Sequence, residues 1–363
     1  MILSNRSKAV LSFFLVLVII LTLILAAEGI VRVRQYIKYG TFYGVTDLYF
    51  DKNSGIHTPL PGMRTASISI NSLGFRGPEI EIPKPDDRLR IGFIGASTTY
   101  CAEVSNNDMV WTDLVSRGLE SSISGLSVDY INAGVPGYTT DTSLINLEKR
   151  VVPLQPDIVI IYHATNDLSG ETRALAETAG IERTNLAAEE SWLGQYSLLW
   201  HLVQKNLALM MLQAPSEAEL LKMDPQSIGD EFRQNLEKLV DVAYSNGSNL
   251  VALMTFSIHL RDGMTIDQQK DAMISARYYM PYLSADDLLG SFKQYNQIIR
   301  EVAEKTGALL IEREHDIPGD PIHFNDSVHF TDKGSLLQAD RVVSALVNSN
   351  EFQKIASAKK NEL

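Results

Sequence analysis

The segment LRIGFIGASTT (residues 89–99) joins an apolar run, Leu89–Ile94, to a glycine, an alanine and three hydroxyl side chains. The run has the length and composition of a buried β-strand. A turn from such a strand into a helix would hold Ser97 at the sheet edge, with its own amide free to donate. Serine and threonine also cap helices routinely, so this segment alone does not establish catalysis. It lacks the G-x-G-x-x-G spacing of dinucleotide-binding turns.

Four more apolar runs follow along the chain, and helical patterns lie between or after them. The runs are Val128–Ile131, Ile158–Tyr162, Leu250–Phe256 and Ala308–Ile311. The helical patterns lie near Met109–Ser121, Thr142–Val151, Glu231–Ser245, Leu288–Lys305 and Asp332–Val347. Apolar strands that alternate with helices indicate an α/β fold with a parallel sheet covered on both faces. In such sheets the active site forms at the carboxyl ends of the strands.

Residues 168–230 do not fit this alternation, because they are too long for an ordinary connection between a strand and the next helix. They contain an apolar helix candidate, Leu198–Leu212. We expect a helical insertion packed on the domain. The alternatives are a lid over the site and a surface that rests on a membrane.

The composition narrows the class of protein. The chain has 363 residues, 45% of them apolar and 21% charged, with one cysteine and a net charge of −12. This apolar fraction supports a packed core, and a lone cysteine cannot form an internal disulfide. Residues 1–38 carry a net charge of +4, so the rest of the chain carries a net charge of −16. An acidic body lacks the positive footprint of a phosphate-binding surface, so we expect no nucleic-acid partner.

The N-terminal region predicts a membrane segment. Ala9–Ala27 is a run of 19 residues without a charge. As a helix rising about 1.5 Å per residue, it nearly covers the ~30 Å hydrocarbon core of a bilayer. The apolar region of a cleaved signal peptide is shorter, about 7–15 residues, so we favour an uncleaved anchor. Basic residues flank the run on both sides, so the positive-inside rule does not give its orientation.

Polar blocks stand where further strands end and before the last helix. They are NAGVPGYT (132–139), YHATND (162–167) and NDSVHFT (325–331). Each block alone has a simpler explanation as a turn or a helix cap. Their joint occurrence at strand ends points to one site.

With these blocks in view, the sequence resembles the SGNH/GDSL hydrolase family over about Arg88–Ser349. The resemblance places Ser97 as nucleophile, Gly137 and Asn166 as oxyanion residues, and Asp326 and His329 as acid and base. It also implies the fold, a three-layer α/β/α arrangement around a five-stranded parallel sheet (flavodoxin-like). The lead-in INSLGFRGPE (70–79) is similar to that of membrane-anchored bacterial members.

Two segments depart from the family pattern. Residues 95–97 read Gly-Ala-Ser where the family has Gly-Asp-Ser, and residues 164–167 read Ala-Thr-Asn-Asp rather than Gly-x-Asn-Asp. The replaced aspartate is not part of the catalytic set. We interpret both departures as tuning of the site rather than its loss.

The chemistry of these residue types agrees with the roles. Ser97 Oγ needs a base, and His329, with an unperturbed pKa of about 6.5, can serve near neutral pH. Asp326, three positions earlier, can accept the second ring N–H and fix the tautomer. The backbone N–H groups of Ser97 and Gly137 and the Asn166 amide would bind the oxyanion.

The remaining candidates receive lesser roles. We expect His163, Thr98 and Tyr138 to line the substrate pocket, and Cys101 to be a packed residue. No acid lies three residues before His163, His259, His315 or His323 in a setting comparable to that of His329, so we expect none of them to be the base. No cluster has metal-ligand spacing, so we expect no metal or other cofactor.

These observations predict a single-pass membrane protein with an extracytoplasmic esterase domain, the location being implied by the resemblance. The expected substrates are short-chain, acetyl-type esters of carbohydrates or lipids. The alternatives are an O-acyltransferase that modifies a cell-envelope glycan and a non-catalytic glycan-binding module. The expected parts are a tail (1–8), the anchor (9–27), a lead-in with at most one hairpin (28–87), the hydrolase domain (88–349) and a polar tail (350–363).

Overall fold

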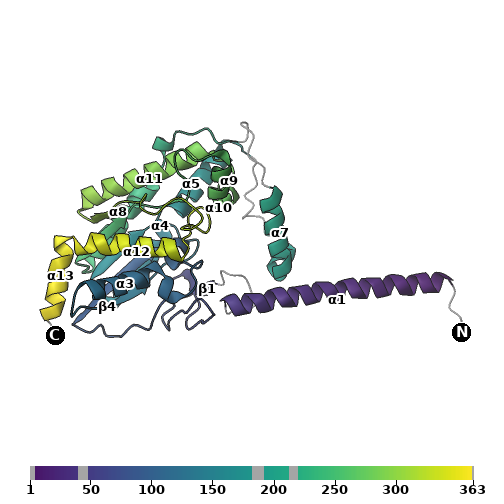
Figure 1. Cartoon of the computed structure of the whole chain (residues 1–363), viewed down its shortest axis with the longest axis horizontal. Helices are drawn as coiled ribbons and strands as arrows, with labels where there is room; N and C mark the ends of the chain where they lie inside the picture. Colours follow the sequence, from purple (N-terminus) through teal and green to yellow (C-terminus); the bar gives the residue numbers. More distant parts are fainter. Residues whose placement is uncertain (1–4, 40–47, 182–191, 212–219, 362–363) are drawn as a thin grey trace.

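Five parallel strands form the centre of the protein in this computed structural model, which describes residues 5–39, 48–181, 192–211 and 220–361 (Figure 1). Their order across the sheet is β4-β3-β5-β6-β7. They are β3 (Arg88–Gly95), β4 (Ser127–Asn132), β5 (Ile158–Tyr162), β6 (Leu250–Met254) and β7 (Leu309–Ile311). Each lies within two residues of a predicted strand, and the predicted α/β fold with its five-stranded parallel sheet is confirmed.

The register of the sheet brings the functional blocks to one edge. Phe93 of β3 pairs with Asn132 of β4, and Gly95 pairs with Tyr162 of β5. The chain first adds β4 on one side of β3 and then β5 on the other, so the connections diverge beyond the carboxyl end of β3. Open α/β sheets bind their ligands at such a switch point.

Helices cover both faces of the sheet (Figure 1). One layer contains α3 (Trp111–Ser122), α12 (Asp332–Val347) and α13 (Asn350–Asn361). The other contains α4 (Thr140–Asn146), α5 (Thr165–Thr178), α8 (Asp230–Ser245) and α11 (Ala285–Thr306). The remaining helices are α1 (Asn5–Tyr39), α2 (Ser97–Tyr100), α6 (Trp192–Tyr196), α7 (Leu198–Met211), α9 (Ile266–Ala272) and α10 (Ile274–Tyr279).

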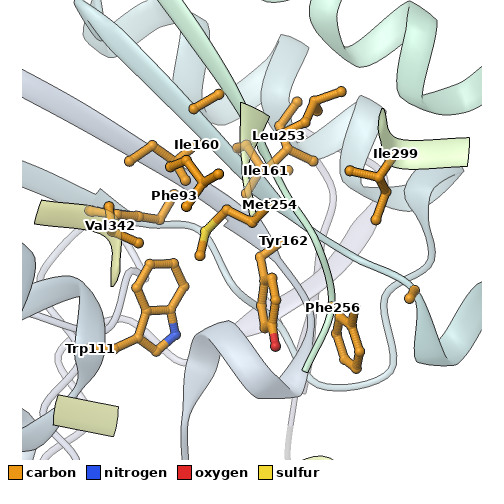
Figure 2. Close-up of a cluster of buried hydrophobic side chains, with 14 of the residues drawn as sticks. Phe93, Trp111, Ile160, Ile161, Tyr162, Leu253, Met254, Phe256, Ile299 and Val342 are labelled. Carbon is orange, nitrogen blue, oxygen red and sulfur yellow. The ribbon is translucent and has the colours of Figure 1, made fainter. Parts of the chain in front are cut away.

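Side-chain packing between the sheet and its helices forms the core (Figure 2). Trp111 of α3 meets Tyr162 of β5 edge-on, with ring centroids 6.0 Å apart. Tyr162 stacks on Phe256 at 4.6 Å. Buried aromatic pairs of this kind stabilise a fold beyond their area alone, by about 0.5–1.5 kcal/mol. The cluster lies beside the ends of β5 and β6 and gives the site rigid support.

The lead-in packs against the catalytic domain. It contains one hairpin, β1 (Leu48–Asp51) and β2 (Ile56–Pro59), as the sequence analysis allowed. Further along the lead-in, two isolated antiparallel bridges join Arg64 with Ser69 and Ile70 with Arg76.

The expected polar tail is instead a helix. Phe352 and Ala356 of α13 are 0% and 1% exposed, and Lys359 Nζ donates to the Asp86 carbonyl at 2.9 Å. Phe352 and Ala356 share one face of the helix and pack on the core together with the partly buried Ile355, which docks this otherwise polar segment.

Helix α1 projects from the body (Figure 1). It runs unbroken past the predicted end of the anchor at residue 27, and its segment Leu11–Ile37 contains an 18-residue window with a mean hydropathy of 2.9 and no buried residue. By length and composition this segment is able to cross a membrane, as an anchor or as a signal sequence.

The expected insertion divides into several parts. Its first residues belong to α5, an ordinary crossover helix, and α6 and α7 follow. Helix α7 agrees with the predicted helix Leu198–Leu212 up to Met211, and residue 212 lies outside the described residues. Residues 182–191 and 212–219 of the insertion lie outside them as well.

Candidate active site

Ser97 is the first residue of the short helix α2, directly after β3. The turn requires the glycine at position 95. A Cβ there would press against the Thr99 side chain and lie 2.9 Å from the carbonyl oxygen of Tyr162. The chain therefore bends sharply into α2 and leaves Ser97 partly exposed at the carboxyl edge of the sheet.

Two buried side chains hold α2 in place. Trp111 Nε1 donates to the carbonyl of Thr98 at 3.1 Å. Arg76 Nη1 donates to the carbonyls of Tyr100 at 2.8 Å and Cys101 at 2.5 Å. Arg76 comes from the lead-in, and its side chain is almost fully buried. Because the last carbonyls of a helix lack partners within the helix, this guanidinium fixes the carboxyl end of α2.

The turn before α12 carries the predicted acid and base. Asp326 Oδ1 accepts the backbone N–H groups of Val328 at 2.9 Å and His329 at 3.0 Å. Asp326 Oδ2 lies 2.8 Å from His329 Nδ1. A carboxylate only accepts, so Nδ1 carries the proton and the neutral imidazole presents Nε2 as an acceptor.

That acceptor meets the predicted nucleophile. His329 Nε2 lies 2.8 Å from Ser97 Oγ, although the two residues are 232 positions apart in the sequence. The side chains of His329 and Asp326 are 16% and 19% exposed. The structure thus brings the three predicted side chains into one hydrogen-bonded chain.

The charges around His329 change its basicity. Burial lowers its pKa by disfavouring the charged imidazole, but the Glu103 charge and the Asp326 hydrogen bond and charge outweigh this and raise the pKa to about 9. For Asp326, burial acts to raise the pKa, and the hydrogen bonds from His329 and Val328 and the His329 charge produce a net lowering. The pKa of His329 therefore lies above the unperturbed value of about 6.5.

His259 holds the turn that carries Asp326 and His329 through hydrogen bonds to its main chain. Its backbone N–H donates to the Ser327 carbonyl at 2.9 Å, and its ring Nδ1 lies 3.2 Å from the Asp326 carbonyl. The ring stacks on Phe324, with centroids 5.7 Å apart and an interplanar angle of 7°. Since a carbonyl oxygen can only accept, Nδ1 is the donor. His259 thereby holds the main chain of the acid–base turn at two consecutive residues.

The loop after β4 contains the predicted oxyanion glycine. Val135 N donates to the Gly95 carbonyl at 3.3 Å, which ties this loop to the nucleophile turn. Gly137 has φ +85°, a backbone conformation that favours glycine, and a Cβ there would meet no atom within 4 Å. Within the described ranges, the backbone N–H groups of Ser97 and Gly137 donate no hydrogen bond, so both remain available to a ligand.

Asn166 lies beside this loop, in the first turn of α5. One N–H of its amide donates to the Tyr138 carbonyl at 2.8 Å, which leaves the other available. The next residue, Asp167, accepts the Thr140 backbone N–H at 2.9 Å and the Thr140 hydroxyl at 2.5 Å. Burial raises the pKa of Asp167 to about 6. Two adjacent residues of α5 thus position the loop that carries Gly137.

The three residues expected to line the pocket are buried. His163 is 3% exposed with Nε2 2.8 Å from Ser143 Oγ, and burial lowers its pKa to about 3. Tyr138 is 5% exposed and donates its hydroxyl to a backbone carbonyl of the lead-in. Thr98 is 2% exposed. All three are therefore packed side chains, and their contact with a substrate stays a prediction.

Other reactive side chains are accounted for. Cys101 is fully buried, and burial raises its pKa to about 12, so the thiolate is disfavoured. His323 lies 2.8 Å from Asp320, three residues earlier, so it does have an acid in a comparable setting and the expectation was wrong there. Among the described residues, no group of three His, Cys, Asp or Glu side chains is placed to hold a metal ion.

Three residues that act on the site received no such role from the sequence: Glu103, His259 and Arg76. Glu103 is exposed six residues after Ser97, and its charge acts on the His329 imidazole. His259 follows β6, so its position at a strand end was the signal available. Arg76 was quoted only within a lead-in motif, and its burial against α2 depends on tertiary packing.

The family model described as the GDSL-like Lipase/Acylhydrolase family matches residues 93–337. No curated protein matches the chain. Similar solved structures include a lipase/acylhydrolase from Enterococcus faecalis, at 20% identity, 71% of this chain, 94% of that chain and a TM-score of 0.41. Another is Axe2, an acetylxylan esterase from Geobacillus stearothermophilus, at 15% identity, 72% and 95% coverage and a TM-score of 0.42.

Proposed function

The chain belongs to the GDSL-like lipase/acylhydrolase family and is a serine hydrolase that acts on ester bonds, and from this premise we propose that Ser97, His329 and Asp326 form its catalytic triad. One observation carries the proposal: Ser97 Oγ, the His329 ring and the Asp326 carboxylate form a continuous chain with 2.8 Å at both contacts. Nucleophile, base and orienting acid in this geometry are the requirements for acyl transfer through a serine.

The proposed reaction begins at Ser97. Its Oγ attacks the ester carbonyl as the proton passes to His329 Nε2, and Asp326 stabilises the imidazolium that forms. The leaving alkoxide takes that proton and departs as the alcohol, leaving an acyl-enzyme on Ser97. A water molecule then attacks the acyl carbon as His329 takes its proton, and return of that proton to Ser97 Oγ breaks the bond to the acyl group, which releases the acid and regenerates the free serine.

Three donors are proposed for the oxyanion of the tetrahedral intermediates. They are the backbone N–H groups of Ser97 and Gly137 and the free N–H of the Asn166 amide. The loop contacts at Val135 and Tyr138 support this assignment, because they fix the Gly137 loop to both of its neighbours. One such donor typically lowers the activation barrier by about 2.7–4 kcal/mol when it is aimed at the developing charge.

We propose that the acyl group is short, of acetyl type, on a carbohydrate or lipid. Ala96, Val135 and Tyr138, which adjoin the nucleophile and the oxyanion glycine, pack with Ile56 into a small buried cluster. Packed side chains at this wall favour a small acyl group over a long one.

We also propose that α1 is an uncleaved membrane anchor and that the catalytic domain lies outside the cytoplasm. The length and mean hydropathy of Leu11–Ile37 support the anchor. The exposure of residues 11–26 supports it further, because a core helix of this composition would be covered by protein.

The test uses the purified full chain in detergent with a series of chromogenic esters from acetyl to octanoyl and with acetylated envelope glycans. We expect acetyl esters to be hydrolysed fastest and Ser97→Ala to abolish turnover. Unchanged turnover in Ser97→Ala would contradict the mechanism. A parallel arm with an acceptor sugar separates hydrolysis from O-acyl transfer, since a transferase yields an acylated sugar in place of free acid.

A further inference from the structure

Helix α7 carries an exposed apolar stripe. Trp200, Val203 and Leu207 are spaced as i, i+3 and i+7, so they share one helical face, and they are 42%, 37% and 47% exposed. The adjoining helix α6 adds Leu193 and Tyr196, which are 49% and 70% exposed. Contiguous exposed apolar side chains mark an interaction surface.

A single carboxylate joins α7 to α1. Glu28 accepts the backbone N–H groups of Leu198 at 3.0 Å and Leu199 at 2.9 Å, and the Ser197 hydroxyl at 2.8 Å. The first N–H groups of a helix lack partners within it, and a negative charge there complements the helix dipole. Glu28 therefore caps α7 from a different helix.

Arg32, one turn further along α1, reinforces this junction. Its Nε donates to Glu28 Oε1 at 2.6 Å, and its Nη2 donates to the Tyr196 carbonyl at 2.9 Å. The Glu28–Arg32 ion pair of α1 thus holds the end of α6 and the start of α7 at one point. Both carboxylate oxygens of Glu28 accept hydrogen bonds there.

The position of this junction on α1 indicates what the stripe contacts. Glu28 is the first charged residue after the apolar run Ala9–Ala27, so it marks the level at which the hydrocarbon core would end. Figure 1 shows α7 extending away from α1 with one end close to it, toward the end of α1 nearer the body, rather than alongside it. A helix that extends sideways from a membrane-spanning helix at this level lies along the membrane surface.

We propose that α7 is a second membrane contact, which lies in the lipid interface with Trp200, Val203 and Leu207 turned into the bilayer and is held there by Glu28. The proposal rests on the proposed anchoring of α1. Tryptophan and tyrosine are favoured at this level of a bilayer, and the apolar face of an interfacial helix enters it by about 5–10 Å. The occupant of the stripe is therefore the glycerol and upper acyl region of the lipid.

The test uses the full chain carrying Trp192→Phe, reconstituted into phosphatidylcholine vesicles. Trp200 and Trp111 then remain, and Trp111 is 0% exposed inside the domain. We expect lipids brominated near the glycerol to quench the Trp200 emission strongly, and lipids brominated near the chain end to quench it weakly. The matched control, Trp192→Phe with Trp200→Phe, reports Trp111 alone and should show no quenching.

Flotation of the same vesicles after a carbonate wash separates the two proposals. A chain that floats while Trp200 remains unquenched overturns the membrane contact and leaves the anchor intact; a dimer in that sample would identify a second copy as the occupant. A chain that fails to float overturns both proposals. Glu28→Ala should float normally and lose much of the quenching, with a smaller loss in Glu28→Gln. Full quenching in Glu28→Ala would overturn its role as the tether.

Discussion

Two turns with the same Asp-x-x-His pattern lie six residues apart, Asp320–His323 and Asp326–His329. In each, one aspartate oxygen accepts the backbone N–H groups two and three residues later, at 2.9 and 3.1 Å in the first turn and 2.9 and 3.0 Å in the second. The carboxylate lies 2.8 Å from the histidine Nδ1 in both. The two turns are locally similar, although Asp320 makes all three contacts through Oδ1 and Asp326 presents Oδ2 to the histidine ring.

They differ in what the second ring nitrogen meets. His329 Nε2 contacts Ser97 Oγ, whereas within the described part of the chain no hydrogen bond joins His323 Nε2 to another residue. The second turn is also tied to His259 through two consecutive main-chain carbonyls. The short pattern thus builds an oriented histidine, and in the proposed mechanism its tertiary placement beside a serine makes it a base.

Replacing the histidine of each turn by alanine should separate the two turns most strongly, through their effect on kcat. His329→Ala should lower kcat on a chromogenic acetyl ester by about 10⁴–10⁶-fold, because Ser97 loses its base. His323→Ala removes an equivalent local pair without touching Ser97, so its kcat should match the parent. Similar losses in both variants would mean that the turns contribute through stability rather than chemistry, which thermal unfolding of both would reveal.

The support beneath the second turn gives a smaller effect. His259→Phe keeps an aromatic ring against Phe324 but loses the ring N–H to the Asp326 carbonyl, so we expect kcat to fall by about 10–100-fold through misplacement of the turn. KM and the melting temperature should change little. His259→Gln, which retains an N–H donor, should recover part of the rate. A rise in KM at constant kcat would instead assign His259 to substrate binding.

The pH dependence of kcat/KM tests the environment of His329, and here we expect the smallest change. Only the neutral His329 imidazole acts as a base, so kcat/KM should rise with pH through its raised pKa of about 9. Glu103→Gln removes one cause of the raised value and should move the rising limb to lower pH, which increases activity at pH 7. Added salt should move the parent in the same direction, because Glu103 is exposed and its charge is screened. A limb that does not move in Glu103→Gln would exclude this carboxylate as the cause.

The same pKa has a consequence for stability. The pKa of His329 in the folded protein lies above its value of 6.5 in the unfolded chain. The charged imidazole, paired with Asp326, therefore contributes its full stabilisation of the fold below pH 6.5. This contribution is lost as the pH rises through about 9.

The sequence predicted those parts of the fold and the site that depend on local pattern. The apolar runs located all five strands of the sheet. The polar blocks contained Ser97, Asp326 and His329, which the structure brings together, and the family resemblance implied their roles. The Asp320 turn shows the limit of this reasoning, since the same pattern arises without a serine beside it.

What could not be predicted depends on contacts between distant segments. The burial of Arg76 beneath α2, the influence of Glu103 on His329 and the docking of Phe352 all arise from packing. Glu28 is the extreme example. In the sequence it reads as a flanking charge of an apolar run, and in the structure it caps a helix that begins 170 residues later.

The central claim is that Ser97 is a nucleophile activated by His329, and covalent labelling with a fluorophosphonate tests it most directly. After a short exposure of the full chain, peptide mass spectrometry should place one label on Ser97 in the parent and in His323→Ala. His329→Ala should remain almost unlabelled over the same time. Equal labelling in the two histidine variants, or a label on a residue other than Ser97, would contradict the account.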